Sequence, residues 1–477
     1  MSEISVSRIV DLSQDGRGVA RLKTDGAVGK KSTKATNPAA GKRPRTRLST
    51  RLGRSASQQR TGKAVGKTCF ISGALPGELV RWQRTQTRGS YDEGHVVEVI
   101  EPSTDRVTPH CKHFDDCGGC ALQHLAIASQ PSLKQTHLQA LLQRAGIQPG
   151  HWLPPLISAP WGYRCRARLQ VSFNKSVLAL GFHQQSSNNI VDIDECSILD
   201  PRLASKLLPL RDGLQRAGAF LKRHRLIEVE LLASDNGCAL CLRFKTDLDV
   251  VRDVSALSAV EAFCRQHEWQ CWVAKQQQPP ERWLGESNMY VELEDDVKIQ
   301  ISPGQFVQVN AAVNRRMIAQ SLQLLELEST HRVLDLFAGA GNFSLPMAKR
   351  AKHVCGVEGA EPLCQQGREN AQLNSITNTD FRVADLSKPD LLQHFLKNKI
   401  QFERILIDPP RTGAQALIPD LAALRAEKLL YISCHPAALV RDTRGLLEAG
   451  YNMASIGILD MFPHTEHLEA MALFELR

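Results

Sequence analysis

From about residue 331 onward, short apolar strands alternate with helical segments, and this alternation constrains the fold more than any other feature of the sequence. The predicted strands are Arg332–Phe337, His353–Glu358, Arg404–Asp408 and Leu429–Ser433. Such alternation is typical of a parallel, doubly wound sheet, in which helices connect successive strands. Ligands of these sheets bind beyond the carboxyl ends of the strands. We therefore predict a Rossmann-like α/β domain with its binding site at that edge.

The first of these strands runs directly into the glycine turn Ala338–Asn342, which lets a ligand approach the backbone closely. The next strand ends in Glu358, where a carboxylate can bind both hydroxyls of a ribose. Asp385 and Asp408-Pro409-Pro410-Arg411 fall at the ends of the two following strands. The sequence has neither a second phosphate-binding glycine set nor a Gly-Lys-Ser/Thr motif, so S-adenosylmethionine fits better than NAD or ATP. Ordinary solvated strand ends are the alternative for Glu358 and Asp385.

A cysteine and a polar loop are predicted at the same edge. Cys434 follows the last of these strands and precedes His435-Pro436, a helix start that would favour the thiolate. The segment Asp460–Glu469 places acids and histidines between two apolar strands. A thiolate can add covalently to an electron-poor ring carbon, and a base must later remove a proton so that elimination frees the thiol. A cysteine and a carboxylate are therefore the minimum set, although the sequence does not say which acid acts.

Cys111, Cys117 and Cys120 form a C-x5-C-x2-C cluster in a chain of 13 cysteines. Nothing in the sequence indicates export, and no apolar run approaches the length needed to cross a bilayer, so we expect a cytoplasmic protein. In a reducing compartment, such a cluster more often binds metal than forms disulfides. The cysteines could serve as ligands either of zinc or of a [4Fe–4S] cluster, and the spacing alone does not choose between the two.

The fourth ligand is also open, with Cys196 as the candidate and Cys165 as its competitor. Cys165 lies in a segment that alternates like a strand, so it could simply pack in the core. Cys238 and Cys241 resemble a metal-binding pair, but they follow the hairpin turn Asp235-Asn236-Gly237 and are interpreted as strand residues.

The formal net charge of +9 is concentrated near the N-terminus, where residues 1–70 contain 16 Lys or Arg and four Asp or Glu. Residues 26–67 hold 12 of these cations and no acid or aromatic residue, which predicts a disordered basic insertion at about 22–65. Short strands with glycine turns on either side predict a small β-barrel over residues 1–100. A basic end on a near-neutral body points to a nucleic acid partner, although a solvated charged tail is an equal alternative.

Five motifs carry a family resemblance that covers nearly the whole chain. They are Ser302–Asn310, Asp335–Asn342, Asp408–Arg411, Ser433–Pro436 and Asp460–Glu469. In order and spacing, they resemble the bacterial RNA 5-methyluridine methyltransferases, in particular the subgroup that acts on uracil-1939 of 23S ribosomal RNA. The resemblance implies methylation of uridine C5 through a covalent cysteine adduct, with Cys434 as the nucleophile and Glu469 as the base.

The resemblance also implies the other site residues. It makes the S-adenosylmethionine contacts Gln305, Phe337, Asn342, Glu358, Asp385 and Asp408, of which Asp408 could instead face the uracil edge. It makes the ligands of a [4Fe–4S] cluster Cys111, Cys117, Cys120 and Cys196. It further implies three domains: an oligonucleotide-binding-like TRAM barrel over 1–100, a central α/β iron–sulfur domain over 101–300, and a Rossmann-like methyltransferase domain over 301–477.

The chain departs from the family pattern in a few places. Residues 22–65 are largely extra, Ala338 and Ala340 stand where the family often has Cys and Met, and Asp385 stands where a relative has Asn. The alternatives are a uridine-C5 methyltransferase for tRNA or another ribosomal site, and a non-catalytic iron–sulfur protein that binds RNA. A radical S-adenosylmethionine enzyme would need C-x3-C-x2-C, which the five-residue gap after Cys111 does not provide.

Overall fold

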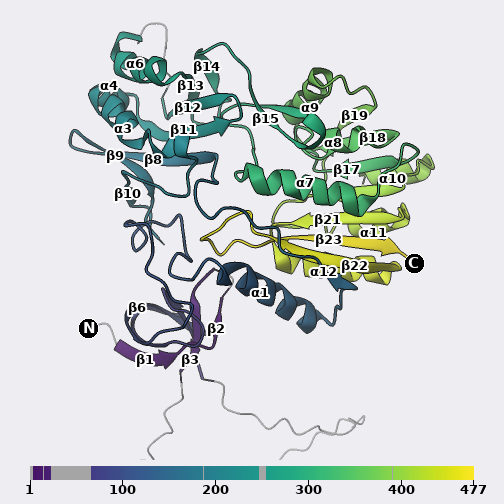
Figure 1. Cartoon of the computed structure of the whole chain (residues 1–477), viewed down its shortest axis with the longest axis horizontal. Helices are drawn as coiled ribbons and strands as arrows, with labels where there is room; N and C mark the ends of the chain where they lie inside the picture. The colour runs from purple at the N-terminus through teal and green to yellow at the C-terminus, as the bar shows by residue number, and fades with distance from the viewer. Residues whose placement is uncertain (1–3, 14, 23–65, 186, 247–253, 389) are drawn as a thin grey trace, which may run out of the picture. The chain divides into compact units, whose positions relative to one another are not determined.

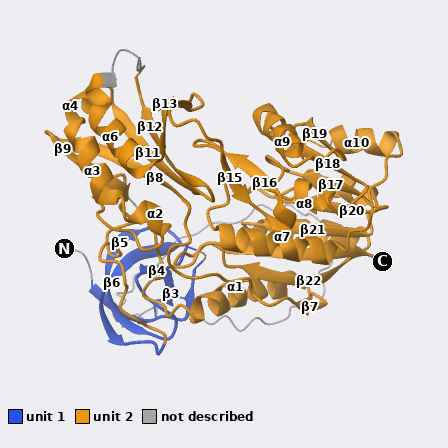
Figure 2. Cartoon of the chain, turned by 45° about the horizontal axis from the view of Figure 1, so that its top comes forward, with its two compact units in different colours: residues 1–104 blue, residues 105–477 orange. Residues whose placement is uncertain are grey.

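The computed structural model describes residues 4–13, 15–22, 66–185, 187–246, 254–388 and 390–477. These form two compact units, Met1–Thr104 and Asp105–Arg477 (Figure 2). The predicted basic insertion lies almost entirely outside the described residues. The expected boundaries at residues 100 and 300 stay predictions, because the second unit is a single compact body. In the described ranges, no helix combines the length and hydropathy of a membrane span.

The first unit is a six-stranded sheet in the order β1-β5-β6-β4-β3-β2. Its strands are β1 (Ile4–Arg8), β2 (Asp11–Leu12), β3 (Gly18–Arg21), β4 (Thr68–Ser72), β5 (Leu79–Thr87) and β6 (Tyr91–Glu101). Only Ile9 and Val10 separate β1 from β2, yet these strands lie at opposite edges of the sheet, so the sheet must curl on itself. Its interior holds Ile71 and Trp82 in a small apolar core.

The second unit begins with α1 (Ser129–Ala145), which ends at Gly146 in a left-handed conformation. A seven-stranded sheet follows, in the order β10-β9-β8-β11-β12-β13-β14. Its strands are β8 (Arg166–Asn174), β9 (Val177–His183), β10 (Ile190–Asp192), β11 (Leu226–Ser234), β12 (Gly237–Phe244), β13 (Trp269–Lys275) and β14 (Glu281–Leu284). Its helices are α2 (Pro201–Ala204), α3 (Leu207–Arg216), α4 (Gly218–Arg223) and α6 (Ser258–His267).

The predicted hairpin is confirmed, because β11 and β12 pair antiparallel across Asp235 and Asn236. Cys238 and Cys241 are buried on β12, which confirms that they are strand residues. A separate two-stranded hairpin, β15 (Met289–Glu292) and β16 (Lys298–Ile301), leads to the long helix α7 (Ala311–Leu325).

The C-terminal part holds an eight-stranded sheet in the order β19-β18-β17-β20-β21-β23-β22-β7. Its strands are β17 (Arg332–Leu336), β18 (His353–Glu358), β19 (Thr379–Val383), β20 (Arg404–Ile407), β21 (Lys428–Ser433), β22 (Tyr451–Leu459), β23 (Glu469–Leu476) and β7 (His151–Trp152). Strands β17 to β21 pair in parallel, which confirms the doubly wound prediction. Strand β23 enters antiparallel between β21 and β22.

Helices cover both faces of this sheet (Figure 1). They are α8 (Ser344–Ala348), α9 (Glu361–Leu373), α10 (Asp390–Lys397), α11 (Ile418–Ala423) and α12 (Pro436–Glu448), together with α1 and α7. Successive strand residues point to opposite faces. Val333 therefore packs into the core beneath α7, α8 and α9, whereas Leu334 packs into the core beneath α1, α10, α11 and α12.

Candidate active site

The carboxyl ends of β17, β18, β20 and β21 open onto a cavity of about 1110 Å³. Most of the predicted site residues line this one cavity: Phe337, Asn342, Glu358, Asp408, Cys434, Glu469, Cys111, Cys117, Cys120 and Cys196. Gln305 and Asp385 are not part of its lining. Segments separated by more than 300 residues in the sequence therefore share one site.

The glycine turn after β17 has the backbone geometry that the sequence required. Gly339 and Gly341 have φ values of 56° and 98°, in the left-handed region that favours glycine. Phe337 is also left-handed, with φ of 63°, which is uncommon for a bulky residue and turns its side chain to the cavity. The carboxylate of Glu358 accepts hydrogen bonds from the backbone N–H groups of Gly339 at 3.1 Å, Gly359 at 2.7 Å and Ala360 at 3.1 Å. These bonds fix Glu358 at the rim of the turn.

Asn342 is held by a partner that the sequence did not reveal. The side-chain amides of Asn342 and Asn314 donate to each other's oxygens, at 3.0 and 2.9 Å. Asn314 is buried on α7 and lines the cavity. Its signal in the sequence is an amide side chain on the buried face of α7, which otherwise holds apolar residues and one serine, Ser321.

Cys434 lies between β21 and α12, as predicted. The helix start is present, with the ring nitrogen of His435 accepting a hydrogen bond from the N–H of Ala438 at 3.2 Å. The expected stabilisation of the thiolate is wrong, however, because the pKa of Cys434 is raised. Burial has the largest effect, the charges of Glu469 and Asp408 add to it, and Arg411 acts in the opposite direction. Here burial and two acids outweigh the helix terminus.

Glu469 is the first residue of β23 and is only 8% exposed. Burial raises its pKa to about 8, with a further contribution from Asp408 and an opposing one from Lys134. Burial likewise raises the pKa of Asp408 to about 7. Within the described residues, neither carboxylate group forms a hydrogen bond. Cys434, Asp408 and Glu469 thus lie in one partly or fully buried set of groups, each with a raised pKa.

Asp385 and Gln305 are engaged elsewhere. Asp385 is exposed two residues after β19, and its carboxylate accepts hydrogen bonds from the N–H and hydroxyl of Ser387, at 3.0 and 2.6 Å. These bonds, followed by Lys388, lower the pKa of Asp385 to about 2. Gln305 accepts from the N–H of Ser302 at 3.1 Å and donates to Gln366 at 3.4 Å.

The four candidate cluster cysteines are free thiols that lie near one another. Burial raises the pKa of Cys196 to about 12, and the charges of Cys120, Cys111 and Cys117 raise it further. In the parts of the chain that the structure describes, no three His, Cys, Asp or Glu side chains converge in a metal-binding arrangement. Cys165, the competitor, instead packs in the central core, with its Sγ 3.5 Å from the carbonyl oxygen of Gln308.

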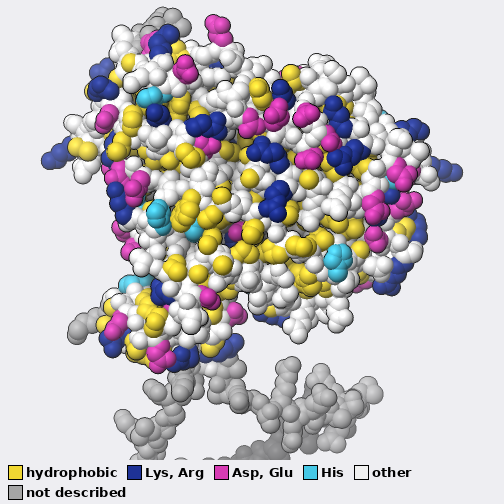
Figure 3. Space-filling view, viewed as in Figure 1, with side chains coloured by type: hydrophobic (Ala, Val, Ile, Leu, Met, Phe, Trp, Pro, Cys, Tyr) yellow, Lys and Arg dark blue, Asp and Glu magenta, His cyan; other side chains and the backbone are white. Residues whose placement is uncertain are grey.

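Neither sign of charge dominates the face of the described residues that Figure 3 shows. On the face seen in Figure 3, Lys and Arg side chains are interspersed with Asp and Glu rather than gathered in one basic patch. This face therefore gives no simple electrostatic footprint for a nucleic acid.

Comparisons with known proteins agree with the geometry. The model of the tRNA (Uracil-5-)-methyltransferase family matches residues 156–477. The 23S rRNA (uracil(1939)-C(5))-methyltransferase RlmD of Alcanivorax borkumensis is 38% identical, over 86% of this chain and 92% of that protein. The enzyme of the same name from Legionella pneumophila strain Lens is 37% identical, over 98% of this chain and 96% of that protein.

A solved structure shows the same fold. The tRNA (uracil-54, C5)-methyltransferase of Pyrococcus abyssi, in complex with S-adenosyl-L-homocysteine, superimposes with a TM-score of 0.67 at 21% identity, covering 99% of this chain and all of that one. The resemblance inferred from the motifs is confirmed, and the chain belongs to the tRNA (uracil-5-)-methyltransferase family.

Proposed function

We propose that this protein transfers a methyl group from S-adenosylmethionine to C5 of uracil-1939 in 23S ribosomal RNA, through a covalent adduct on Cys434. The observation that carries the proposal is the meeting of Cys434, Asp408 and Glu469 in the cavity into which the glycine turn and Glu358 also open. The target nucleotide follows the names of the relatives that are similar over most of their length.

Each reacting group has one role. The thiolate of Cys434 adds to C6 of the uracil, and the resulting enolate takes the methyl group at C5 from the sulfonium, which leaves as a neutral thioether. The carboxylate of Glu469 then takes the proton from C5, the C5–C6 double bond reforms, and the C6–S bond breaks with its electron pair returning to sulfur. A pKa of about 8 suits a base that works near neutral pH. The target base must leave its stack to enter so deep a site.

The cofactor contacts divide into two groups. Phe337, Asn342 and Glu358 line the cavity, and Glu358 is proposed to bind the ribose hydroxyls. Asp408 lies between the turn and the nucleophile and is proposed to contact either the cofactor or the uracil edge. Gln305 and Asp385 have less support, because neither residue is part of the cavity lining.

We also propose that Cys111, Cys117, Cys120 and Cys196 bind a [4Fe–4S] cluster. The chemistry of the donors supports this proposal, because four free thiols line one cavity and the charges of three of them act on Cys196. In the described residues the four side chains do not yet converge as cluster ligands do, so cluster binding would have to draw them together. Zinc would accept the same set, and the family resemblance favours iron and sulfide. Such a cluster would link the loop 111–120 to the segment around Cys196, and nothing in the methyl transfer requires its electrons. Iron, sulfide and zinc analysis of anaerobically purified protein tests the assignment.

The curled sheet of residues 4–101 is proposed to be a TRAM-type module that binds RNA, supported by its six-stranded, curled topology and the family resemblance. The basic segment 26–65 is proposed to attract phosphate without base specificity, so its deletion should flatten the salt dependence of RNA binding. A ribosomal RNA substrate is consistent with a cytoplasmic location.

The decisive experiment traps the adduct. The protein is incubated with S-adenosylmethionine and a 5-fluorouridine RNA that contains the 1939 region, and a denaturation-stable complex is expected because fluorine cannot leave as a proton does. With unmodified RNA, Glu469→Gln should lower turnover about 10²- to 10⁴-fold while the methylated adduct accumulates. A matching tRNA arm serves as the competing substrate, because the solved relative is a tRNA enzyme. Absence of both adduct and methyl transfer with either RNA would favour a non-catalytic RNA-binding protein.

A further inference from the structure

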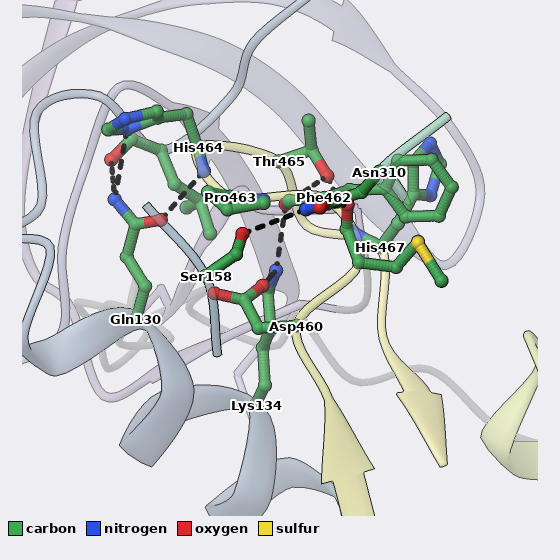
Figure 4. A network of polar contacts seen from close by, with 12 residues as sticks. Gln130, Lys134, Ser158, Asn310, Asp460, Phe462, Pro463, His464, Thr465 and His467 are labelled. Carbon is green, nitrogen blue, oxygen red and sulfur yellow. Dashed lines mark hydrogen bonds and ion pairs between the residues drawn. The ribbon is translucent and has the colours of Figure 1, made fainter. Parts of the chain in front are cut away.

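The loop between β22 and β23, residues 460–468, leads directly into Glu469, and we call it the base loop. Two side chains of α1 reach it (Figure 4). The ammonium of Lys134 forms an ion pair with Asp460 at 2.7 Å and donates to the carbonyl oxygen of Phe462 at 3.0 Å. The side chains of Lys134 and Asp460 are each only 3% exposed. Because both charges are buried, neither can exchange its partner for water, so the ion pair holds the first residues of the base loop in place.

Gln130, one helical turn earlier, holds the middle of the same loop. Its carbonyl oxygen accepts from the backbone N–H of His464 at 2.8 Å, while its amide nitrogen donates to the carbonyl oxygens of Leu122 and Leu125, at 3.0 and 3.1 Å. The carbonyl oxygen of His464 in turn accepts from the N–H groups of Ala121 and Leu122, both at 2.9 Å. The base loop is thus bonded to the chain immediately after Cys120.

Further contacts hold the loop from other segments. The hydroxyl of Tyr163 donates to the carbonyl oxygen of Pro463 at 3.0 Å, and Trp161 stacks on His464 with ring centroids 4.0 Å apart. Asn310 donates to the carbonyl oxygen of Met461 at 3.2 Å. The conformation of the base loop therefore depends largely on partners outside it, and none of these partners takes part in the methyl transfer itself.

We propose that Lys134 and Gln130 are positioning residues for Glu469, because they hold the base loop in the conformation that places the carboxylate at the reaction centre. This inference rests on the proposed function and adds to it that the α1 contacts serve one step of the reaction and not the others. Addition of Cys434 to C6 and methyl transfer to C5 do not need Glu469, whereas removal of the C5 proton does. Loss of the α1 contacts should therefore slow elimination selectively.

The test compares Lys134→Met with Arg144→Met, an exposed cation on the same helix. Each variant, with its fold checked by circular dichroism, is mixed with substrate RNA and S-adenosylmethionine, and covalent adduct and released product are followed over time. For Lys134→Met, product release should fall at least about 10-fold while adduct forms at close to the wild-type rate and accumulates. Lys134→Arg should restore most of the release, and Arg144→Met should match wild type.

The pH profile supplies a second readout. The charged or titratable groups that act on Glu469 come from three elements: Asp408 after β20, Cys434 after β21, and Lys134 on α1. Lys134 opposes the effects of burial and Asp408, so its loss should move the pH at which elimination becomes half-maximal upward. A loop that had merely become unstable would expose Glu469 and move this midpoint downward instead, because burial is the main cause of the raised pKa.

Equal losses of adduct and product in folded Lys134→Met, or unchanged elimination, would overturn the inference. If Lys134→Met does not fold, Gln130→Leu replaces it, with the exposed Gln139→Leu on the same helix as its control and the same adduct-to-product ratio as the readout. Failure of the proposed function gives a different result, because wild type and Glu469→Gln would then form no adduct at all.

Discussion

At one end of the cavity, the polar side chains around the glycine turn already have hydrogen-bond partners, whereas at the other end the reacting groups have almost none. Glu358 accepts three backbone N–H groups and Asn342 pairs with Asn314. Glu469, which is buried, and Asp408, which is partly buried, are by contrast carboxyl groups with raised pKa values and no hydrogen bond in the described residues. The proposed cofactor end is therefore preorganised, whereas the two carboxyl groups of the proposed reaction end have no hydrogen-bond partner in the part of the chain that the structure describes.

The difference follows from what each end has to do. A binding site gains affinity when its groups are fixed before the ligand arrives, because less conformational freedom is lost on binding. A general base is most effective when its pKa lies near the working pH, and burial without hydrogen bonds raises the pKa of a carboxyl group toward that range. Burying a carboxyl group without hydrogen bonds is unfavourable, and the packing around Glu469, including the contacts from α1, must offset this free energy.

The sharpest challenge to this comparison is Cys434→Ala. If the reaction end works by covalent addition, turnover should fall by at least about 10⁴-fold and no adduct should form, while S-adenosylmethionine binding stays close to wild type. Methyl transfer from labelled cofactor and equilibrium binding measure the two effects. Normal methylation by this variant would refute the assignment of the nucleophile.

The raised pKa of Glu469 predicts how activity depends on pH. The base must be ionised, so the rate of elimination should rise about 10-fold per pH unit below about pH 8 and level off above it. Single-turnover decay of the methylated adduct between pH 6 and 9 gives the profile. A flat profile would indicate that Glu469 is already ionised or is not the base.

The free energy of unfolding should fall as pH rises, in contrast to the rate of elimination. Burial raises the pKa values of Asp335 and Asp408 to about 7 and that of Glu469 to about 8, so the folded state binds more protons than the unfolded state. Their favourable contribution is complete below about pH 4 and is lost as pH rises through 7 to 8, by on the order of a few kcal/mol. Urea denaturation of wild type and Asp408→Asn at pH 6 and 8 tests this, and the variant should show a smaller difference between the two pH values.

At the cofactor end, Glu358→Gln should have a moderate effect. Loss of the charge weakens the proposed ribose contact and the three backbone bonds, so the KM for S-adenosylmethionine should rise on the order of 10-fold, with kcat changed much less. Steady-state kinetics with saturating RNA separates the two constants. A large fall in kcat at unchanged KM would place Glu358 in the reaction rather than in binding.

Asp385→Asn is expected to have the smallest effect. Its carboxylate bonds to Ser387 and Lys388 at the surface, so activity and cofactor affinity should stay within about 2-fold of wild type. A KM increase as large as that of Glu358→Gln would show that the loop after β19 closes over the cofactor.

Much of the C-terminal domain could be predicted from the sequence, because apolar strand periodicity and the glycine turn are local signals. The predicted strand ending at Glu358 matches β18, and Cys434 stands between its strand and helix as expected. Strand β7 escaped prediction, since two residues, His151 and Trp152, carry no periodicity and pair with β22 only in the folded chain.

The sequence by itself determined which residue types meet at the carboxyl edge of the sheet, because strand direction and loop position follow from local pattern. Only the tertiary structure determined the pKa values of these residues and the contacts that hold them in place. The pKa of Cys434 is raised although a helix begins beside it, because burial and two distant acids act together. Likewise, Lys134 and Asp460 are 326 residues apart, and no local rule relates them, so their contact and the position of Glu469 depend on the packing of α1 against the sheet.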